Sequence, residues 1–239
     1  MEMASESPIG NSKLQRNHPG ALILFAKDPV LGQVKTRLQP ALDRETTLDL
    51  YRCFLADSIE KICSVAGVDR YVEVASSEVS EYFARIARDS RVSEVSLQVG
   101  KDLGEKMHHA LGKYLDAGYE KVVLIGSDSP SLPASYIQQA FRSGRDMVIG
   151  PSIDGGYYLI GMMRQLTEIF SGVTWGSGSV LEETLERVEA CGRSLELLPV
   201  WYDVDRIEEL RFLKTHLQAL SLSGQGDADA TGKLLKQLF

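Results

Sequence analysis

The chain has 239 residues, of which 44% are hydrophobic and 25% charged, with a formal net charge of −7 and a pI near 5.2. This length suits one folded core, because domains split only beyond roughly 250–300 residues. The acidic balance disfavours long nucleic acids and anionic membranes as partners, and no apolar stretch is long enough for a membrane span or ordered like a signal peptide. We therefore expect a cytoplasmic protein that acts on small molecules.

Short apolar runs alternate with amphipathic stretches in the first half of the chain, the pattern of βα units around a buried sheet. Residues 1–20 are polar and lack periodicity, which predicts a disordered N-terminal extension. Residues 21–26 form a fully apolar run, typical of a strand covered on both faces. The elements expected next are a helix at 44–66, a strand at 71–75, a helix near 79–86, a strand at 95–99 and a helix near 107–115.

The second half continues this alternation. Residues 122–125 are another fully apolar run, and Pro133 suits the first turn of a helix that reaches Ser143. Asp205, with Glu208 three residues later, predicts a capping box for the last long helix. The other expected elements are strands at 147–150 and 157–160, a helix near 185–188, a strand at 195–200, a helix near 210–220, and a linker with a short C-terminal helix at 221–239.

This order of elements predicts one α/β domain over residues 21–220, with a mostly parallel central sheet and helices on both faces. In open sheets of this class, ligands bind beyond the carboxyl ends of the strands. The loops that follow the apolar runs are therefore where a functional site is expected.

The first of these loops is basic. Lys27, Lys35 and Arg37 surround a turn at Gly32, directly after the run at 21–26. Arg binds phosphate in a planar fork and Lys supplies a compact charge, so the loop is predicted to hold a phosphate chain and to stabilise charge that develops on it. A solvated basic loop is the alternative, although such clustering is unusual in an acidic protein. Neither a Walker A loop nor a GxGxxG turn is present.

The second loop exposes a carboxylate. Asp128 lies in the stretch GSDSP at 126–130, after the other fully apolar run. Magnesium in nucleotide sites needs only one or two carboxylates, together with water and substrate phosphates. Asp128 is therefore the expected ligand of Mg²⁺ or Mn²⁺, and the alternative is that it forms a turn before Pro130.

The third loop contains paired glycines. Gly155 and Gly156 let the backbone approach a ligand closely, and Tyr157 offers a hydroxyl and a stacking face. Asp154 is a candidate base or second metal ligand. A plain hairpin turn also uses Asp-Gly, and this alternative stays open.

The fourth region, residues 98–107, runs from a strand into a helix and contains Gly104. The amino end of that helix is expected to help seat an anion or the edge of a base. The alternative is that Asp102 simply caps the helix.

Three stretches are distinctive when they occur together: KTRL at 35–38, GSDSP at 126–130 and DGGYYLIG at 154–161. With TWGS at 174–177 and DVD at 203–205, they resemble a family of bacterial GT-A-like transferases over residues 21–217. Members are known as nucleotide-diphospho-sugar or radical-SAM/selenodomain-associated transferases. The chain is more distantly similar to molybdenum-cofactor and phospholactate guanylyltransferases. The resemblance implies a single-domain, Rossmann-like GT-A fold.

The resemblance also implies roles for individual residues. Lys27, Lys35 and Arg37 would bind phosphates, and Asp128 would hold the metal. Residues 154–157 would lie near the acceptor. Related enzymes use a late acid, which implies Asp203 as a further metal ligand.

These expectations favour a metal-dependent glycosyltransferase that transfers sugar from a nucleotide-diphospho-sugar to a small-molecule acceptor. The close alternative is a guanylyltransferase-like nucleotidyltransferase that acts on a small phosphorylated acceptor. A nucleotide-binding module without catalysis is the alternative of another class. The nucleotide, the acceptor and the oligomeric state stay open.

Overall fold

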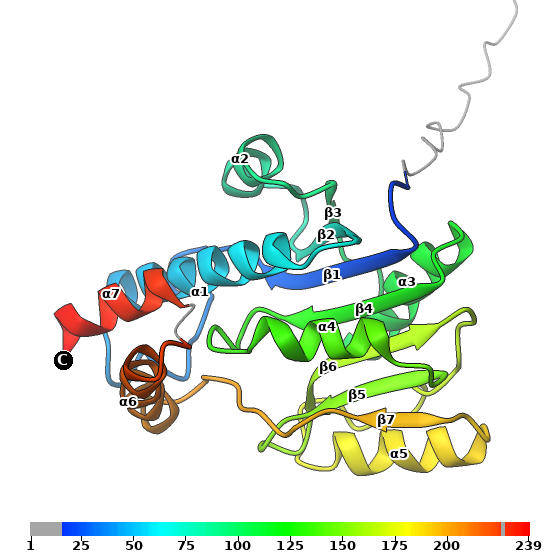
Figure 1. Ribbon diagram of the computed structural model, residues 1–239. Helices are drawn as coiled ribbons and strands as arrows, with labels where there is room; N and C mark the ends of the chain where they lie inside the picture. The colour runs from blue at the N-terminus through cyan, green and yellow to red at the C-terminus, as the bar shows by residue number, and fades with distance from the viewer. Residues whose placement is uncertain (1–15, 226–227) are drawn as a thin grey trace, which may run out of the picture.

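The sheet at the centre of the protein has seven strands (Figure 1). A computed structural model describes residues 16–225 and 228–239. The strands are β1 (Gly20–Lys27), β2 (Val68–Ala75), β3 (Glu94–Leu97), β4 (Lys121–Gly126), β5 (Met147–Pro151), β6 (Tyr157–Met163) and β7 (Leu195–Leu197). Their order is β3-β2-β1-β4-β6-β5-β7, and all neighbouring pairs are parallel except β4 with β6 and β5 with β6. The predicted α/β fold with a mostly parallel sheet is confirmed.

Helices cover both faces of this sheet. Along β1, Leu22 and Leu24 face one core while Ile23 and Phe25 face the other, because successive side chains of a strand alternate between faces. The helices are α1 (Arg44–Ser64), α2 (Glu81–Asp89), α3 (Leu103–Asp116), α4 (Ala134–Arg142), α5 (Val180–Ala190), α6 (Ile207–Leu222) and α7 (Asp229–Leu238). Buried side chains of α1, α4, α6 and α7 join the first core, and those of α3 and α5 join the second.

Several elements differ from their expected bounds. The helix expected near 79–86 begins only at Glu81, and Val79 is exposed. The strand expected at 195–200 is three residues long, although Trp201 continues beside β5 by donating to the carbonyl of Pro151. Most of the predicted N-terminal extension, residues 1–15, lies outside the described residues. No helix within the described ranges is long and apolar enough to cross a membrane.

The carboxyl ends of β1 and β4 lie side by side. The two strands are parallel neighbours, and Phe25 pairs with Gly126 at the end of the ladder. The sequence runs outward from β1 through β2 to β3, and then returns to β4 on the other side of β1. Such a reversal of strand order opens a crevice at the carboxyl edge, so the loops at 27–38 and 126–130 meet there.

Helix α7 packs beside α1 (Figure 1) and takes its cap from that helix. Ala228, at the N-cap position of α7, has no side chain that can accept a hydrogen bond. The buried Asp57 of α1 replaces it, because its two carboxylate oxygens accept from the amides of Ala230 and Thr231, each at 2.9 Å.

We expect Asp57→Ala to lower the free energy of unfolding by about 2 kcal/mol, because it leaves buried amides without an acceptor. Urea unfolding measured by circular dichroism checks this value. The matched control is Asp49→Ala, which replaces an exposed Asp of the same helix. Equal stability of the two variants would contradict a capping role for Asp57.

Candidate functional site

A cleft of about 870 Å³ lies where the loops after β1 and β4 meet. Residues from all four of the loops singled out in the sequence line it. The structure brings the following expected site residues together in this lining: Lys27, Lys35, Arg37, Asp128, Asp154, Gly156, Tyr157 and Asp203. Gly32, Gly104 and Gly155 are not part of the lining.

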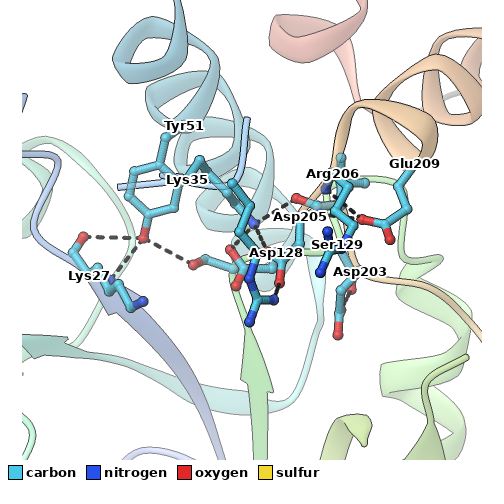
Figure 2. Close-up of polar contacts among 12 residues, drawn as sticks. Lys27, Lys35, Tyr51, Asp128, Ser129, Asp203, Asp205, Arg206 and Glu209 are labelled. Carbon is cyan, nitrogen blue, oxygen red and sulfur yellow. Dashed lines mark hydrogen bonds and ion pairs between the residues drawn. The ribbon is translucent and has the colours of Figure 1, made fainter. Parts of the chain in front are cut away.

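Lys35 lines the cleft next to Asp128 and Asp205 (Figure 2). Only 4% of its side chain is exposed. Its ammonium group contacts Asp128 Oδ1 at 2.6 Å, Asp205 Oδ1 at 2.9 Å and the carbonyl oxygen of Val204 at 2.8 Å. The ammonium also lies 5.5 Å from the centre of the Phe54 ring, within range of a cation–π interaction. Lys35 therefore connects its own loop, which follows β1, with the loop after β4 and with residues 203–205.

The backbone of Lys35 is in the left-handed region, with φ at 46°, which is uncommon for a residue other than Gly. Strain of this kind is retained where surrounding contacts fix the residue. Burial pulls the pKa of Lys35 down, but the charges of Asp128 and Asp205 outweigh burial and raise this pKa above its ordinary value. The side chain is thus held as a cation.

Asp128 follows β4 and reaches the mouth of the cleft. The Asp128 side chain is 43% exposed. The backbone carbonyl oxygen of Asp128 accepts a hydrogen bond from the backbone amide of Val204 at 2.9 Å. This backbone bond brings the DVD stretch at 203–205 next to the loop after β4. The loop is also tied to β1, because the hydroxyl of Tyr51 lies 3.2 Å from Ser127 Oγ and accepts from the amide of Lys27.

Asp203 lies deeper than Asp128. The hydroxyl of Ser129 donates to one of its carboxylate oxygens, and the hydroxyl of Ser152 donates to the other at 3.2 Å. Burial raises the pKa of Asp203 to about 6 against the effect of the Ser129 hydrogen bond, and the nearby charges of Asp128 and Asp154 add to the rise. Asp203 is therefore ionised at neutral pH, at a cost in free energy.

The expectation that Asp205 caps the last long helix is wrong. The carboxylate of Glu209 accepts from the amides of Asp205 and Arg206 at 2.6 and 2.7 Å, so the helix begins one residue later than expected. Asp205 instead binds Lys35 at 2.9 Å and Arg37 at 2.9 Å. Burial acts to raise the pKa of Asp205, but these cations prevail and lower it. Glu209, three residues after Arg206, is the sequence signal for the true cap.

Among the three cations predicted to bind phosphate, Lys27 and Arg37 have donors to spare. The Lys27 side chain has no ion-pair partner among residues 16–225 and 228–239. Arg37 is 60% exposed and uses only Nη1 on Asp205. Lys106 of α3, from the fourth region, and Arg206 also line the cleft.

The loop between β5 and β6 packs closely against residues 176–181 and is hydrogen-bonded to them. Gly155 has φ at +87°, and a Cβ at this position would lie 2.0 Å from the carbonyl oxygen of Gly178. The carbonyl of Gly155 accepts from Leu181, and Asp154 accepts from the amide of Gly156 at 3.0 Å. Gly155 is therefore required by loop packing, while Asp154 and Gly156 line the cleft.

Gly104 also serves packing, because a Cβ there would lie 2.6 Å from the indole nitrogen of Trp175. Asp102 accepts from the amide of Glu105 at 2.8 Å, so it caps α3 as the alternative interpretation held. Trp175 lines the cleft beside Met107. Trp175, from the loop before α5, thus packs on the start of α3 and contributes an aromatic side chain to the cleft there.

The carboxylates fit a divalent metal only in part. Within the described part of the chain, no group of three or more His, Cys, Asp or Glu side chains is arranged to hold a metal. Asp128 and Asp203 could supply two oxygen ligands, which is the usual protein share when Mg²⁺ also binds substrate phosphates. The donor set therefore suits a metal that arrives with a phosphorylated ligand.

The charges that line the cleft are balanced. Its cations are Lys27, Lys35, Arg37, Lys106 and Arg206, and its carboxylates are Asp128, Asp154, Asp203, Asp205 and Glu209. Five positive groups thus face five negative ones. The charged side chains that line the cleft therefore sum to zero at neutral pH.

Comparison with known proteins identifies the family. The model of the family described as "Uncharacterized protein conserved in bacteria (DUF2064)" matches residues 58–177, which are 120 of the 239 residues. The chain belongs to the DUF2064 family. No curated protein sequence matches it.

Solved structures show the same fold. A proposed nucleotide-diphospho-sugar transferase from Desulfovibrio desulfuricans G20 is 30% identical, with a TM-score of 0.82, and the match covers 92% of this chain and 98% of that one. The 4-diphosphocytidyl-2C-methyl-D-erythritol synthase of Anaerococcus prevotii DSM 20548 is 12% identical with a TM-score of 0.54, covering 87% and 100%. The inositol-1-phosphate CTP transferase of T. maritima is 13% identical with a TM-score of 0.51, covering 80% and 91%. The last two similarities concern the fold alone.

Proposed function

We propose that this DUF2064 protein is a metal-dependent transferase whose donor is a nucleoside diphosphate sugar. The balanced charge of the cleft carries this proposal. A diphosphate diester brings about two negative charges, which one divalent ion neutralises, whereas a triphosphate with one such ion leaves about two negative charges without a partner. The name given to the 30% identical structure agrees with a sugar donor.

In this proposal each loop has a separate task. Lys27 and Arg37, with donors to spare, bind the diphosphate, since charge-assisted hydrogen bonds to phosphate are strong. Asp128 and Asp203 would hold the metal, which supplies Lewis-acid stabilisation of the leaving diphosphate. Asp154, at the acceptor side, takes the proton from the attacking group of the acceptor.

Trp175 and Tyr157 contribute aromatic side chains to the lining of the cleft. The indole of Trp175 packs on Gly104, and burial raises the pKa of the Tyr157 hydroxyl, which therefore stays protonated at neutral pH. These walls exclude water around the reacting sugar, which favours transfer to the acceptor over hydrolysis. Gly156, which lines the cleft and has no side chain, leaves room for the sugar beside the loop.

The test uses the purified protein with Mg²⁺ or Mn²⁺, panels of nucleoside diphosphate sugars and nucleoside triphosphates, and a pool of small acceptors from cell extract. We expect metal-dependent release of nucleoside diphosphate from one class of sugar donor. Mass spectrometry identifies the products. Release of pyrophosphate from a triphosphate, without release of diphosphate from any sugar donor, would establish nucleotidyl transfer and refute the proposal.

A further inference from the structure

Lys35 is placed to control when a metal enters the cleft. An ammonium group has three N–H donors. The acceptors around Lys35 are three as well: Val204, Asp128 and Asp205. Lys35 therefore has no donor left for a phosphate unless one of these bonds breaks, which distinguishes it from Lys27 and Arg37.

The ammonium also occupies part of the expected metal site. It contacts Oδ1 of Asp128 at 2.6 Å, and this is the carboxylate that reaches the mouth of the cleft. A metal on the other oxygen of Asp128 would lie within a few ångströms of this fixed positive charge. Repulsion between nearby cations in a half-buried site is strong, because water screens it poorly.

The remaining ligands do not compensate for that repulsion. Asp205 is already engaged by Lys35 and Arg37, and Asp203 is the other carboxylate expected to hold the metal. Within the residues that the structure describes, no three metal-binding side chains are gathered. A divalent ion thus meets two carboxylates and one adjoining cation.

We propose that Lys35 is a resident cation that prevents a divalent metal from binding alone, so that the metal binds only together with the nucleotide. The phosphates of the nucleotide supply both the missing ligands and the negative charge that offsets Lys35. This inference rests on the proposed function, because it assumes the metal site at Asp128. It assigns Lys35 to positioning and to metal control, in place of direct phosphate binding.

The test measures Mn²⁺ binding to the full chain without nucleotide, by the loss of the electron paramagnetic resonance signal of free Mn²⁺. The parent protein is expected to bind Mn²⁺ only at millimolar concentrations. Lys35→Met removes the charge while keeping a chain of similar length, and should tighten Mn²⁺ binding by about tenfold or more. Lys101→Met, which removes an exposed lysine outside the cleft lining, should leave Mn²⁺ affinity unchanged.

Two results would overturn the inference. One is tight Mn²⁺ binding by the parent protein without nucleotide, and the other is a Lys35→Met variant that binds Mn²⁺ no more tightly than Lys101→Met. Calorimetry with UDP, GDP, CDP and ADP in Mn²⁺ separates this failure from failure of the proposed function. A parent protein that binds none of these nucleotides refutes the proposed function, whereas binding of one of them together with either result above refutes only the role of Lys35.

Asp205→Asn keeps the inference testable if Lys35→Met does not fold. Asp205 is 35% exposed, so its replacement should be tolerated, and it leaves the charge of Lys35 less balanced. We expect this variant to bind Mn²⁺ several-fold more weakly than the parent in the presence of the nucleotide that the parent binds. Unchanged or tighter Mn²⁺ binding would contradict the proposed control by charge.

Discussion

Replacing Asp128 with Asn is expected to weaken nucleotide binding in Mg²⁺ by about a hundredfold, because it removes one of two carboxylates available to the metal. The loop should keep its shape. The Asp128 side chain is 43% exposed, and Lys35 retains Asp205 as a counter-ion. Calorimetric titration with the nucleotide, in Mg²⁺ and in EDTA, measures the effect.

The metal dependence should separate this variant from a damaged protein. In EDTA, the Asp128→Asn variant and the parent should bind nucleotide with similar, low affinity. Asp116→Asn, at the exposed end of α3, should bind as the parent does in both conditions. Equal affinity of Asp128→Asn and the parent in Mg²⁺ would remove Asp128 from the metal site.

Asp203→Asn is expected to stabilise the protein while it abolishes metal-dependent turnover. The pKa of Asp203 is raised to about 6 by burial, whereas an unfolded Asp has a pKa of about 3.9. Between these values the folded state binds more protons than the unfolded state, so the contribution of Asp203 to stability falls as the pH rises from about 4 to 6. Above about pH 6 the folded protein bears the full cost of the buried charge, and Asn avoids it.

The gain should therefore depend on pH in a defined way. Relative to the parent, Asp203→Asn should gain about 2 kcal/mol of unfolding free energy at pH 8 and little at pH 4. Urea unfolding of both proteins at several pH values measures the difference in unfolding free energy between the variant and the parent. The other titrating groups contribute equally to both proteins, so their effects cancel in this difference. A gain that is constant from pH 4 to pH 8 would show that ionisation of Asp203 is not the cause. Residues that cost stability are common at functional sites, where activity retains them.

The sequence predicts the centre of the fold better than its edges. The runs at 21–26 and 122–125 are apolar throughout because β1 and β4 lie inside the sheet with both faces covered. β7 is an edge strand whose ladder covers three residues, although Leu198 and Trp201 still donate to carbonyls of β5 beyond it. Tertiary pairing, rather than local pattern, sets such limits.

For the candidate site too, the sequence predicts some features and not others. Strand order places Lys27, Arg37 and Asp128 at one edge of the sheet, and this follows from the rule for parallel sheets. The partners of Lys35 could not be predicted, because they lie in the loop after β4 and in the loop before α6, far away in the sequence. Asp205 was missed for a related reason: Asp followed by Glu three residues later suits a helix cap, and only the tertiary contact with Lys35 shows its other use.

The balanced charge of the cleft also bears on how fast a donor arrives. Electrostatic steering speeds association only when the site and the ligand carry opposite net charge. Here five cations face five carboxylates, and the whole chain carries a net charge of −7. An anionic donor is therefore not drawn in from a distance, and its association rate should not fall as ionic strength rises. Attraction arises only after entry, when individual phosphates lie against individual side chains.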